Sequence, residues 1–479
     1  MLFNSPEFLL FLPLVFAGYW LLSRNLRLQN LFVLVASYVF YGWWDWRFLA
    51  LIAFTSAWSW AFGVMEENAA PRSAASKARL ALSCVVNLGI LGAFKYFNFF
   101  MDQVVWLLRA VGFEPHVASL QVILPVGVSF YTFQALSYTI DVYRRQIRPT
   151  RDPVAFFAFI SFFPQLVAGP IERATNLLPQ FLRPRAFDYG EAVLGCRQML
   201  WGFFKKCVVA DNCAKAADFL LNGAGAANGL GTWLGVFMFS FQIYGDFSGY
   251  SDIAIGCSRL FGIRLMRNFA CPYFARDVAE FWRRWHISLT TWFRDYLYIP
   301  LGGSRCCAWR RVRNTFAIFL VSGLWHGANW TFVAWGAFHA ALFLPLLLGG
   351  TNRRHLDGVA QDRALPSPGE LLDMLRTFLL ALLGWTLFRA RSIGEAISWF
   401  ASMADVRTFG AVRGLPRETA VAATAIAAML ALEWFNRREG FGFARLPRNT
   451  ALRWGAYLVL IWLAVFYTPG SQTFIYFQF

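Results

Sequence analysis

Long apolar runs recur along the whole chain of 479 residues, and they constrain its fold more than any other feature. A helix needs about 20 apolar residues to cross a bilayer. By that measure the sequence predicts roughly eleven spanning helices, near residues 6–22, 30–44, 48–65, 79–97, 153–170, 192–210, 229–245, 314–349, 371–388, 416–434 and 450–467. We therefore expect an all-α, multi-pass membrane protein that forms one domain over residues 1–479.

Charged residues are few and unevenly placed. They make up 15% of the chain, against about 25% in an average soluble domain, yet the net charge is +17. The basic residues cluster in short loops, near 24–27, 72–79 and 305–313, as they do in the cytoplasmic loops of membrane proteins. The pattern predicts contact with a lipid bilayer, argues against nucleic acid and places the N-terminus outside the cytoplasm.

Metal chemistry has little support in the sequence. The eight cysteines are scattered and contain no Cys-x-x-Cys pair, so no metal site is expected. The chain also lacks an HExxH motif, a GxSxG motif and a phosphate-binding glycine loop. Candidates for chemistry are therefore the polar residues inside the apolar runs.

The most unusual of these residues is His326. Residues 315–349 contain no Asp, Glu, Lys or Arg, yet they include His326 and His339. An ionisable group at membrane depth costs about 2.5 kcal/mol or more unless it is partnered or faces a wet cavity. Histidine exchanges a proton near neutral pH, so we interpret His326 as a candidate general base in a buried channel. The alternative is a core histidine that only bridges helices.

The neighbours of this histidine favour an open site. Gly323 and Gly327 allow another backbone or a thin substrate to approach closely, while Trp325 and Asn329 offer an aromatic wall and a hydrogen-bonding group. His339 lies 13 positions further on, which is roughly 20 Å along a straight helix. The two histidines therefore share no site unless the run 314–349 breaks into two segments at Gly327.

Residues 276–298 differ from the spans because they combine charge with a stripe of large apolar residues. The stripe has helical spacing and consists of Trp282, Trp285, Leu289, Trp292 and Tyr296. Arg283 and Arg284 belong to the charged remainder of the surface. The segment is too charged to cross a membrane, so it predicts one amphipathic helix at the membrane interface. His286 flanks its buried stripe and is a second candidate.

Two further polar segments interrupt apolar runs. Asp246 and Asp252 follow the span at 229–245, where they are candidates to anchor a histidine, an arginine or a substrate hydroxyl. The alternative is a capped helix start at the membrane face. Prolines in residues 163–173 break another span, and broken helices at membrane depth usually line cavities buried in protein.

Several stretches together resemble the membrane-bound O-acyltransferase family, and more narrowly its branch that O-acetylates bacterial alginate. They are FYTFQALSYTIDVYR at 130–144, FFPQLVAGPIER at 162–173, YGDFSGYSDIAIG at 244–256, FWRRWHISLTTWFRDYLYIPLGG at 281–303, GLWHGANW at 323–330 and FIYFQF at 474–479. The resemblance covers nearly the whole chain. The basic loop at 304–311 departs from the glycine-containing stretch of the family.

The resemblance implies a funnel or tunnel of many helices in the bacterial inner membrane. It implies that His326 is the principal catalytic residue and His286 a second one. From their positions in the sequence, Asn329, Trp325, Asp246 and Asp252 are weaker candidates for support. It also implies an O-acetyltransferase with no bound cofactor. Acetyl-CoA is then the cytoplasmic donor, and Arg283 and Arg284 are candidates to attract its phosphates.

The same resemblance implies that the acetyl group crosses the membrane to a periplasmic SGNH-like acetyltransferase or acceptor protein, which modifies an exopolysaccharide such as alginate. Three alternatives stay open. One is the transfer of D-alanine or another acyl group to a cell-wall polymer. The others are a transporter, which buried histidines and broken helices also suit, and a scaffold that only docks the polysaccharide machinery.

Overall fold

The computed structural model describes residues 1–114, 125–167, 169–222, 228–468 and 474–475. Every regular element in this part of the chain is a helix, from α1 to α20, with short 3-10 and π turns between some of them. Two compact units make up the chain, Met1–Glu191 with Ser258–Leu265 and Ala192–Cys257 with Met266–Phe479. The single membrane domain expected over residues 1–479 stays a prediction.

Within the described residues, five helical segments are long and apolar enough to cross a membrane. They are Trp46–Glu66, Ala74–Ala110, Trp330–Leu348, Pro368–Arg389 and Arg417–Phe435, and the shorter apolar helices Pro6–Leu21 and Thr450–Phe466 add to them. Leucines and valines such as Leu458 and Val465 face outward, where they match the apolarity of lipid tails. The all-α, multi-pass membrane fold is confirmed, with fewer clear spans than the roughly eleven expected from run length alone.

The first unit holds the helices of the N-terminal part. They are α1 (Pro6–Leu21), α2 (Leu26–Gly42), α3 (Leu49–Glu66), α4 (Ala74–Leu91), α5 (Phe97–Ala110), α6 (Val128–Tyr143), α7 (Pro153–Ser161), α8 (Phe163–Leu166) and α9 (Ala174–Phe181). Buried polar side chains of α2 bind the end of α9, because Asn30 Nδ2 donates to the Phe181 carbonyl (2.8 Å) and Arg185 donates to Gln29 (3.0 Å). Hydrogen bonds of this kind offset the cost of burying polar groups.

The run 153–170 is broken rather than continuous. Phe162 leaves the helical conformation (ψ 109°) between α7 and α8, and Pro164 sits in the first turn of α8, where its missing N–H is tolerated. The N–H of Phe163 donates instead to Ser37 Oγ (3.1 Å). The break predicted from the prolines is confirmed, whereas the expected full-length span is wrong because neither short helix is long enough to cross a bilayer.

The second unit holds both candidate histidines. Its helices are α10 (Tyr189–Phe203), α11 (Asp211–Asn222), α12 (Gly229–Leu260), α13 (Val278–Arg284), α14 (Ile287–Phe293), α15 (Ala308–His326), α16 (Trp330–Leu348), α17 (Pro368–Arg389), α18 (Ile393–Ala404), α19 (Arg417–Phe435) and α20 (Thr450–Phe466). The π-helical turn η3 (Phe204–Ala210) joins α10 to α11. Expected as a span that ends near residue 245, α12 instead continues to Leu260.

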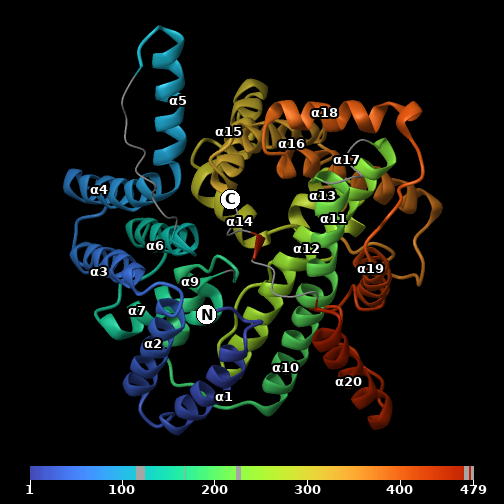
Figure 1. The fold of residues 1–479 in the computed structure, drawn as a ribbon. Helices are drawn as coiled ribbons and strands as arrows, with labels where there is room; N and C mark the ends of the chain where they lie inside the picture. The colour runs from blue at the N-terminus through green and yellow to red at the C-terminus, as the bar shows by residue number, and fades with distance from the viewer. Residues whose placement is uncertain (115–124, 168, 223–227, 469–473, 476–479) are drawn as a thin grey trace. The chain divides into compact units, whose positions relative to one another are not determined.

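The run 314–349 forms an antiparallel hairpin of α15 and α16, which lie side by side (Figure 1). Gly327 ends α15, and the Asn329 side chain caps α16 by accepting from Thr331 N (3.1 Å). A Cβ at Gly323 would lie 2.2 Å from the Phe332 carbonyl oxygen, and one at Gly336 would lie 2.4 Å from the Phe319 carbonyl oxygen. The run therefore breaks into two segments at Gly327, as sharing of a site by His326 and His339 would require. Gly323 also allows the backbone of the neighbouring helix to approach closely, as the sequence suggested.

The single amphipathic helix expected over residues 276–298 is wrong. The segment consists of α13, α14 and the π-helical turn η5 (Arg294–Tyr298), and Trp285 and His286 separate α13 from α14. His286 adopts a left-handed conformation (φ 42°, ψ 56°), which no α-helix continues through. The stripe residues Trp282, Trp285 and Leu289 are nevertheless buried. The helical spacing of the large apolar residues thus predicted which side chains are buried, but it did not predict the break between α13 and α14.

Candidate active site

His286 and His326 line one cavity of about 480 Å³ in the second unit, which we call the histidine cavity. Their ring centroids lie 6.5 Å apart, and both side chains are buried. A cavity of this size is typical of small-molecule and cofactor sites. Two proton-exchanging side chains therefore line the same cavity.

His326 is the last residue of α15 and is packed among aromatic rings. The centroid of its imidazole lies 5.0 Å from Trp325, 5.1 Å from Trp335 and 5.3 Å from Phe388. These rings come from α15, α16 and α17, so three helices fix the orientation of one imidazole. An environment of this kind removes water and strengthens any electrostatic interaction made inside it.

His286 is held by Asn268, which lies in the loop before α13. His286 Nδ1 is 3.0 Å from Asn268 Oδ1, and the Phe247 ring of α12 packs edge-on against the imidazole at 4.6 Å. In contrast, Nε2 of His286 is buried without a hydrogen-bond partner among the described residues. Burial lowers the pKa of His286 to about 3, so its imidazole is neutral near pH 7.

The histidine cavity extends along one face of α15. Its lining includes Thr315, Ile318, Phe319, Ser322 and His326, whose spacing follows a single helical face over about 16 Å. Arg283, Arg294 and Arg353 also line the cavity. The cavity thus connects a cationic lining to the paired histidines, an arrangement that suits a long ligand with an anionic part.

His339 packs outside this lining. Its ring lies 5.0 Å from Trp335 and 4.9 Å from Trp282. A Cβ at Gly384 of α17 would lie 2.5 Å from His339 Nε2, so the glycine makes room for this ring. His339 follows Trp335 by four residues on α16, and the turn between α15 and α16 brings His326 onto the same ring. Of His326 and His339, His326 alone lines the cavity.

The two candidates beside His326 have different environments. The Trp325 ring lies 5.0 Å from His326 and 5.8 Å from His286, so it contacts both histidines. Asn329 caps α16, donates from Nδ2 to the Arg391 carbonyl (2.9 Å) and does not line the cavity. The geometry therefore gives Asn329 a role in shaping the turn that follows His326.

The carboxylates of α12 pair with two consecutive buried lysines. Lys206 Nζ lies 2.8 Å from both Asp246 Oδ1 and Asp211 Oδ1, while Lys205 Nζ lies 2.5 Å from Asp252 Oδ2. Neither carboxylate lines the histidine cavity. A capped helix start is also wrong for this motif, because α12 runs through it without interruption.

The carboxylate of Asp246 also binds the C-terminal motif, whose residues 476–479 lie outside the described residues. Its Oδ2 accepts from Ile475 N (2.6 Å). Phe474 packs on Phe247 at 6.0 Å, and Phe247 contacts His286. The DFSGYSD stretch thereby supports His286 through an aromatic side chain rather than through a carboxylate.

Arg283 and Arg284 point to different partners. Arg283 lines the cavity and donates to the carbonyls of Asn352 (2.7 Å) and His355 (2.6 Å). Arg284 donates to Glu280 Oε1 (2.6 Å) and to the Ala270 carbonyl (3.2 Å). Of this pair, the lining includes Arg283 alone.

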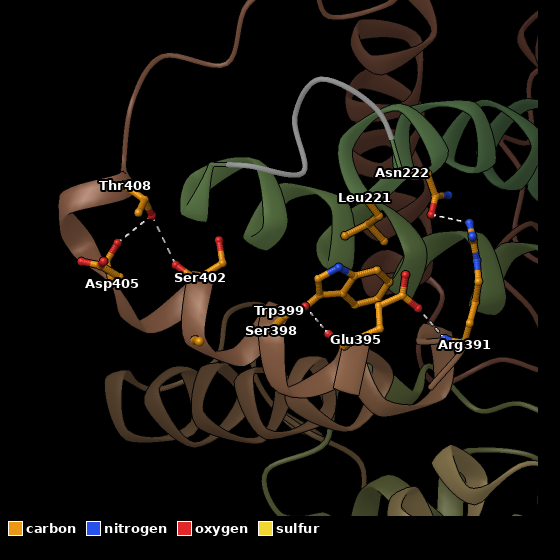
Figure 2. A pocket seen from close by; sticks show the side chains of 10 residues that line it. Leu221, Asn222, Arg391, Glu395, Ser398, Trp399, Ser402, Asp405 and Thr408 are labelled. Carbon is orange, nitrogen blue, oxygen red and sulfur yellow. Dashed lines mark hydrogen bonds between the residues drawn. The ribbon is translucent and has the colours of Figure 1, made fainter. Parts of the chain in front are cut away.

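A second hollow, of about 650 Å³, lies between the end of α11 and α18 (Figure 2). Arg391 crosses it, donating to Asn222 Oδ1 (2.7 Å) from its side chain and to Glu395 Oε2 (2.6 Å) from its backbone. The lining includes neither histidine. Asn329, which follows His326 by three residues, donates to the Arg391 carbonyl and so connects this hollow to the turn beside the active site.

Sequence reasoning missed Asn268, Lys205 and Lys206. Asn268 stands in an ordinary Arg-Asn-Phe stretch, 18 residues before the histidine that it contacts, and carries no motif. The two lysines could have been found from the sequence, because two adjacent charges inside an apolar run require partners of opposite charge. The paired carboxylates of α12 are those partners.

The chain is similar to known proteins over most of its length. Residues 145–355 match the membrane-bound O-acyltransferase family model. The chain is 39% identical to a probable alginate O-acetylase of Pseudomonas putida, over 100% of both chains. It is 42% identical to a probable alginate O-acetylase of Azotobacter vinelandii, over 84% of this chain and 78% of that one. It is also 35% identical to a peptidoglycan O-acetyltransferase of Helicobacter pylori, over 84% of this chain and 80% of that one.

Proposed function

The chain belongs to the membrane-bound O-acyltransferase family, and from this premise we propose that it transfers acetyl from acetyl-CoA toward an exopolysaccharide such as alginate. The observation that carries the proposal is the pair His286 and His326, 6.5 Å apart on one buried cavity. The names of the related proteins, alginate and peptidoglycan O-acetylating enzymes, support acetyl as the group transferred.

In the proposed reaction an acceptor hydroxyl attacks the carbonyl carbon of the acetyl thioester. His326 accepts the hydroxyl proton as the C–O bond forms. The C–S bond then breaks, and the thiolate of CoA leaves with that proton. General-base assistance of this type contributes about 10²–10⁴-fold, and holding both substrates in one cavity contributes at least a comparable factor.

The donor would lie along α15. The face from Thr315 to His326 is long enough, at about 16 Å, for the pantetheine arm of CoA to extend toward the histidines. Arg283, Arg294 and Arg353 line the cavity, and arginine is well suited to bind phosphate. The cluster of basic residues at 305–313, which spans the loop before α15 and the first turns of that helix, supports a cytoplasmic entrance at this end.

The acceptor would arrive from the opposite face of the bacterial inner membrane. We propose a periplasmic SGNH-like acetyltransferase or acceptor protein as the partner that passes the acetyl group to the polysaccharide. A multi-pass membrane enzyme with a cytoplasmic donor needs such a relay, because acetyl-CoA itself does not cross the bilayer. Transfer of D-alanine or another acyl group to a cell-wall polymer is the alternative within the same chemistry.

The test is transfer of radiolabelled acetyl from acetyl-CoA by the purified protein in lipid vesicles. Label in the supplied partner or polymer supports the enzyme, and mass spectrometry of the product identifies the acceptor. A transporter or scaffold would leave the label in acetyl-CoA. Label incorporated from an aminoacyl thioester but not from acetyl-CoA would favour the alternative acyl group.

A further inference from the structure

Asn268 joins three groups at the break between α13 and α14. Its Oδ1 lies 3.0 Å from His286 Nδ1 and accepts from Ser288 N (3.3 Å) and from the Ser288 hydroxyl (2.9 Å). Its Nδ2 donates to Ser251 Oγ of α12 (3.0 Å). Its backbone carbonyl accepts from Ile287 N (2.9 Å). One buried side chain therefore orders the segment on which His286 sits.

The orientation of the Asn268 amide follows from these contacts. The backbone N–H of Ser288 is a donor in every protonation state, so the atom facing it must be the carbonyl oxygen of the amide. The oxygen shared with His286 Nδ1 is consequently an acceptor. A neutral imidazole satisfies that acceptor only when its proton is on Nδ1, which leaves the lone pair on Nε2.

We propose that Asn268 is a positioning residue that holds His286 in the Nδ1-protonated tautomer, so that Nε2 accepts a hydrogen bond from a second donor group of the acceptor, beside the hydroxyl that reacts in the histidine cavity. This inference rests on the proposed function, since that function supplies the hydroxyl. Nε2 is buried without a hydrogen-bond partner among the described residues, and His286 lines the cavity. His326 then takes the one proton of the reacting hydroxyl, while the hydrogen bond to His286 Nε2 holds the acceptor in place.

The backbone of His286 supports the same inference. A non-glycine residue in the left-handed region is strained, and such strain persists only where the surroundings determine it. Here two backbone bonds bracket the residue, from Ala270 N to the Arg284 carbonyl (3.0 Å) and from Ile287 N to the Asn268 carbonyl (2.9 Å). The loop that carries Asn268 thus fixes both the backbone and the ring of His286.

Few charges face the imidazole. The rings packed around it among the described residues are Phe247, Phe269, Trp325 and His326, and His326 is the titratable one. On the adjoining helices Arg284 pairs with Glu280 and Lys206 pairs with Asp246. Arg283 donates to the carbonyls of Asn352 and His355, and with Arg294 and Arg353 it lines the same cavity as His286. Two polar groups contact Nδ1, Asn268 Oδ1 at 3.0 Å and the Ser288 hydroxyl at 3.4 Å. The Ser288 hydroxyl donates its proton to Asn268 Oδ1, so neither group supplies a proton to Nδ1, and the nearer Asn268 oxygen favours the tautomer with the proton there.

The first test compares Asn268→Leu with Ser251→Ala in acetyl transfer. Asn268→Leu removes the acceptor for Nδ1 and is expected to lower kcat about tenfold to a hundredfold, as the loss of an orienting partner does. Ser251→Ala removes only the partner of Nδ2, so kcat is expected to stay within about threefold of wild type. Asn268→Asp keeps an acceptor at the same position and is expected to retain more activity than Asn268→Leu.

A double substitution separates positioning from general loss of structure. If Asn268 acts through His286, Asn268→Leu adds little loss of kcat to His286→Ala. Multiplicative losses in the double variant would contradict the proposal. Elution from size-exclusion chromatography and the melting temperature of each variant show whether it is folded.

The tautomer is measured directly by nitrogen NMR of the protein labelled with ¹⁵N-histidine in lipid vesicles, with His286 assigned from the signal lost in His286→Ala. Wild type is expected to show Nδ1 protonated and Nε2 unprotonated, whereas Asn268→Leu is expected to show a mixture. In Asn268→Asp the added negative charge favours the imidazolium, so the titration midpoint of His286 should rise by roughly one unit or more. A proton on Nε2 in wild type overturns the proposal. This readout needs no substrate, so it stands even if acetyl-CoA is not the donor.

Discussion

The imidazole rings of His286 and His326 lie 6.5 Å apart on one cavity, although they belong to different elements of the second unit. Two local breaks create this proximity. The helix α13 ends at Arg284, and His286 takes a left-handed conformation in the break before α14. Gly327 ends α15 directly after His326. Each histidine therefore lies at a point where the backbone leaves a helix, and the packed rings around them fix the pair.

The close contact between α15 and α16 predicts that Gly336→Ala destabilises the protein. The added Cβ would lie 2.4 Å from the Phe319 carbonyl oxygen, and backbone cannot yield as a flexible side chain does. Overpacking of this kind typically costs about 1–3 kcal/mol, so the melting temperature in detergent should fall. Gly455→Ala is the matched control, because nothing lies within 4 Å of its Cβ. Equal melting temperatures for both variants would contradict this account of the hairpin.

The buried lysine of η3 predicts a larger loss of stability in Lys206→Met. The substitution leaves Asp246 and Asp211 buried without their shared cation, and removal of one partner from a buried ion pair costs about 3–5 kcal/mol. Thermal unfolding of the purified protein measures the loss, and adding Asp246→Asn should restore part of it. Lys215→Met removes a partly exposed lysine 3.6 Å from Glu418, where a loss of about 0–1 kcal/mol is expected. A Lys206→Met protein as stable as Lys215→Met would show that the cluster is not a stabilising centre.

The cationic lining of the cavity predicts that Arg353→Glu raises the KM for acetyl-CoA and leaves kcat nearly unchanged. Arg353 lines the histidine cavity, whereas the adjacent Arg354 does not. Reversing a charge near the phosphates of bound acetyl-CoA weakens the binding of this donor without changing the histidines. The effect should be smaller at high salt, because exposed charges are screened. Steady-state kinetics at two ionic strengths measure both quantities. If Arg354→Glu raises the KM as much as Arg353→Glu, the donor does not bind as proposed.

Much of the fold followed from the sequence, and the reasons are physical. Apolar run length predicted the all-α membrane fold, and the cost of burying an unpartnered histidine made His326 a candidate from the sequence alone. The periodicity of residues 276–298 found Trp282, Trp285 and Leu289 as buried side chains. These features depend on local composition, which the sequence displays directly.

The rest depended on long-range contacts that no local pattern encodes. The helical spacing of residues 276–298 predicted one continuous helix with His286 beside its apolar stripe. The chain instead breaks at His286, because the loop that carries Asn268 forms hydrogen bonds with this segment. Asp246 and Asp252 looked available for a substrate, yet Lys206 and Lys205 pair with them. A sequence shows which groups need partners, but the partners come from elements far apart in the chain.

The most direct test of the central claim is the rate of acetyl transfer from radiolabelled acetyl-CoA by His326→Gln in lipid vesicles. Glutamine keeps a polar side chain of similar length but cannot accept the hydroxyl proton. We predict a rate about 10²–10⁴-fold below wild type, with an unchanged melting temperature. His339→Gln is the matched control, since that buried histidine does not line the cavity, and its rate should stay within about threefold of wild type. A wild-type rate in folded His326→Gln would contradict the assignment of His326 as the general base.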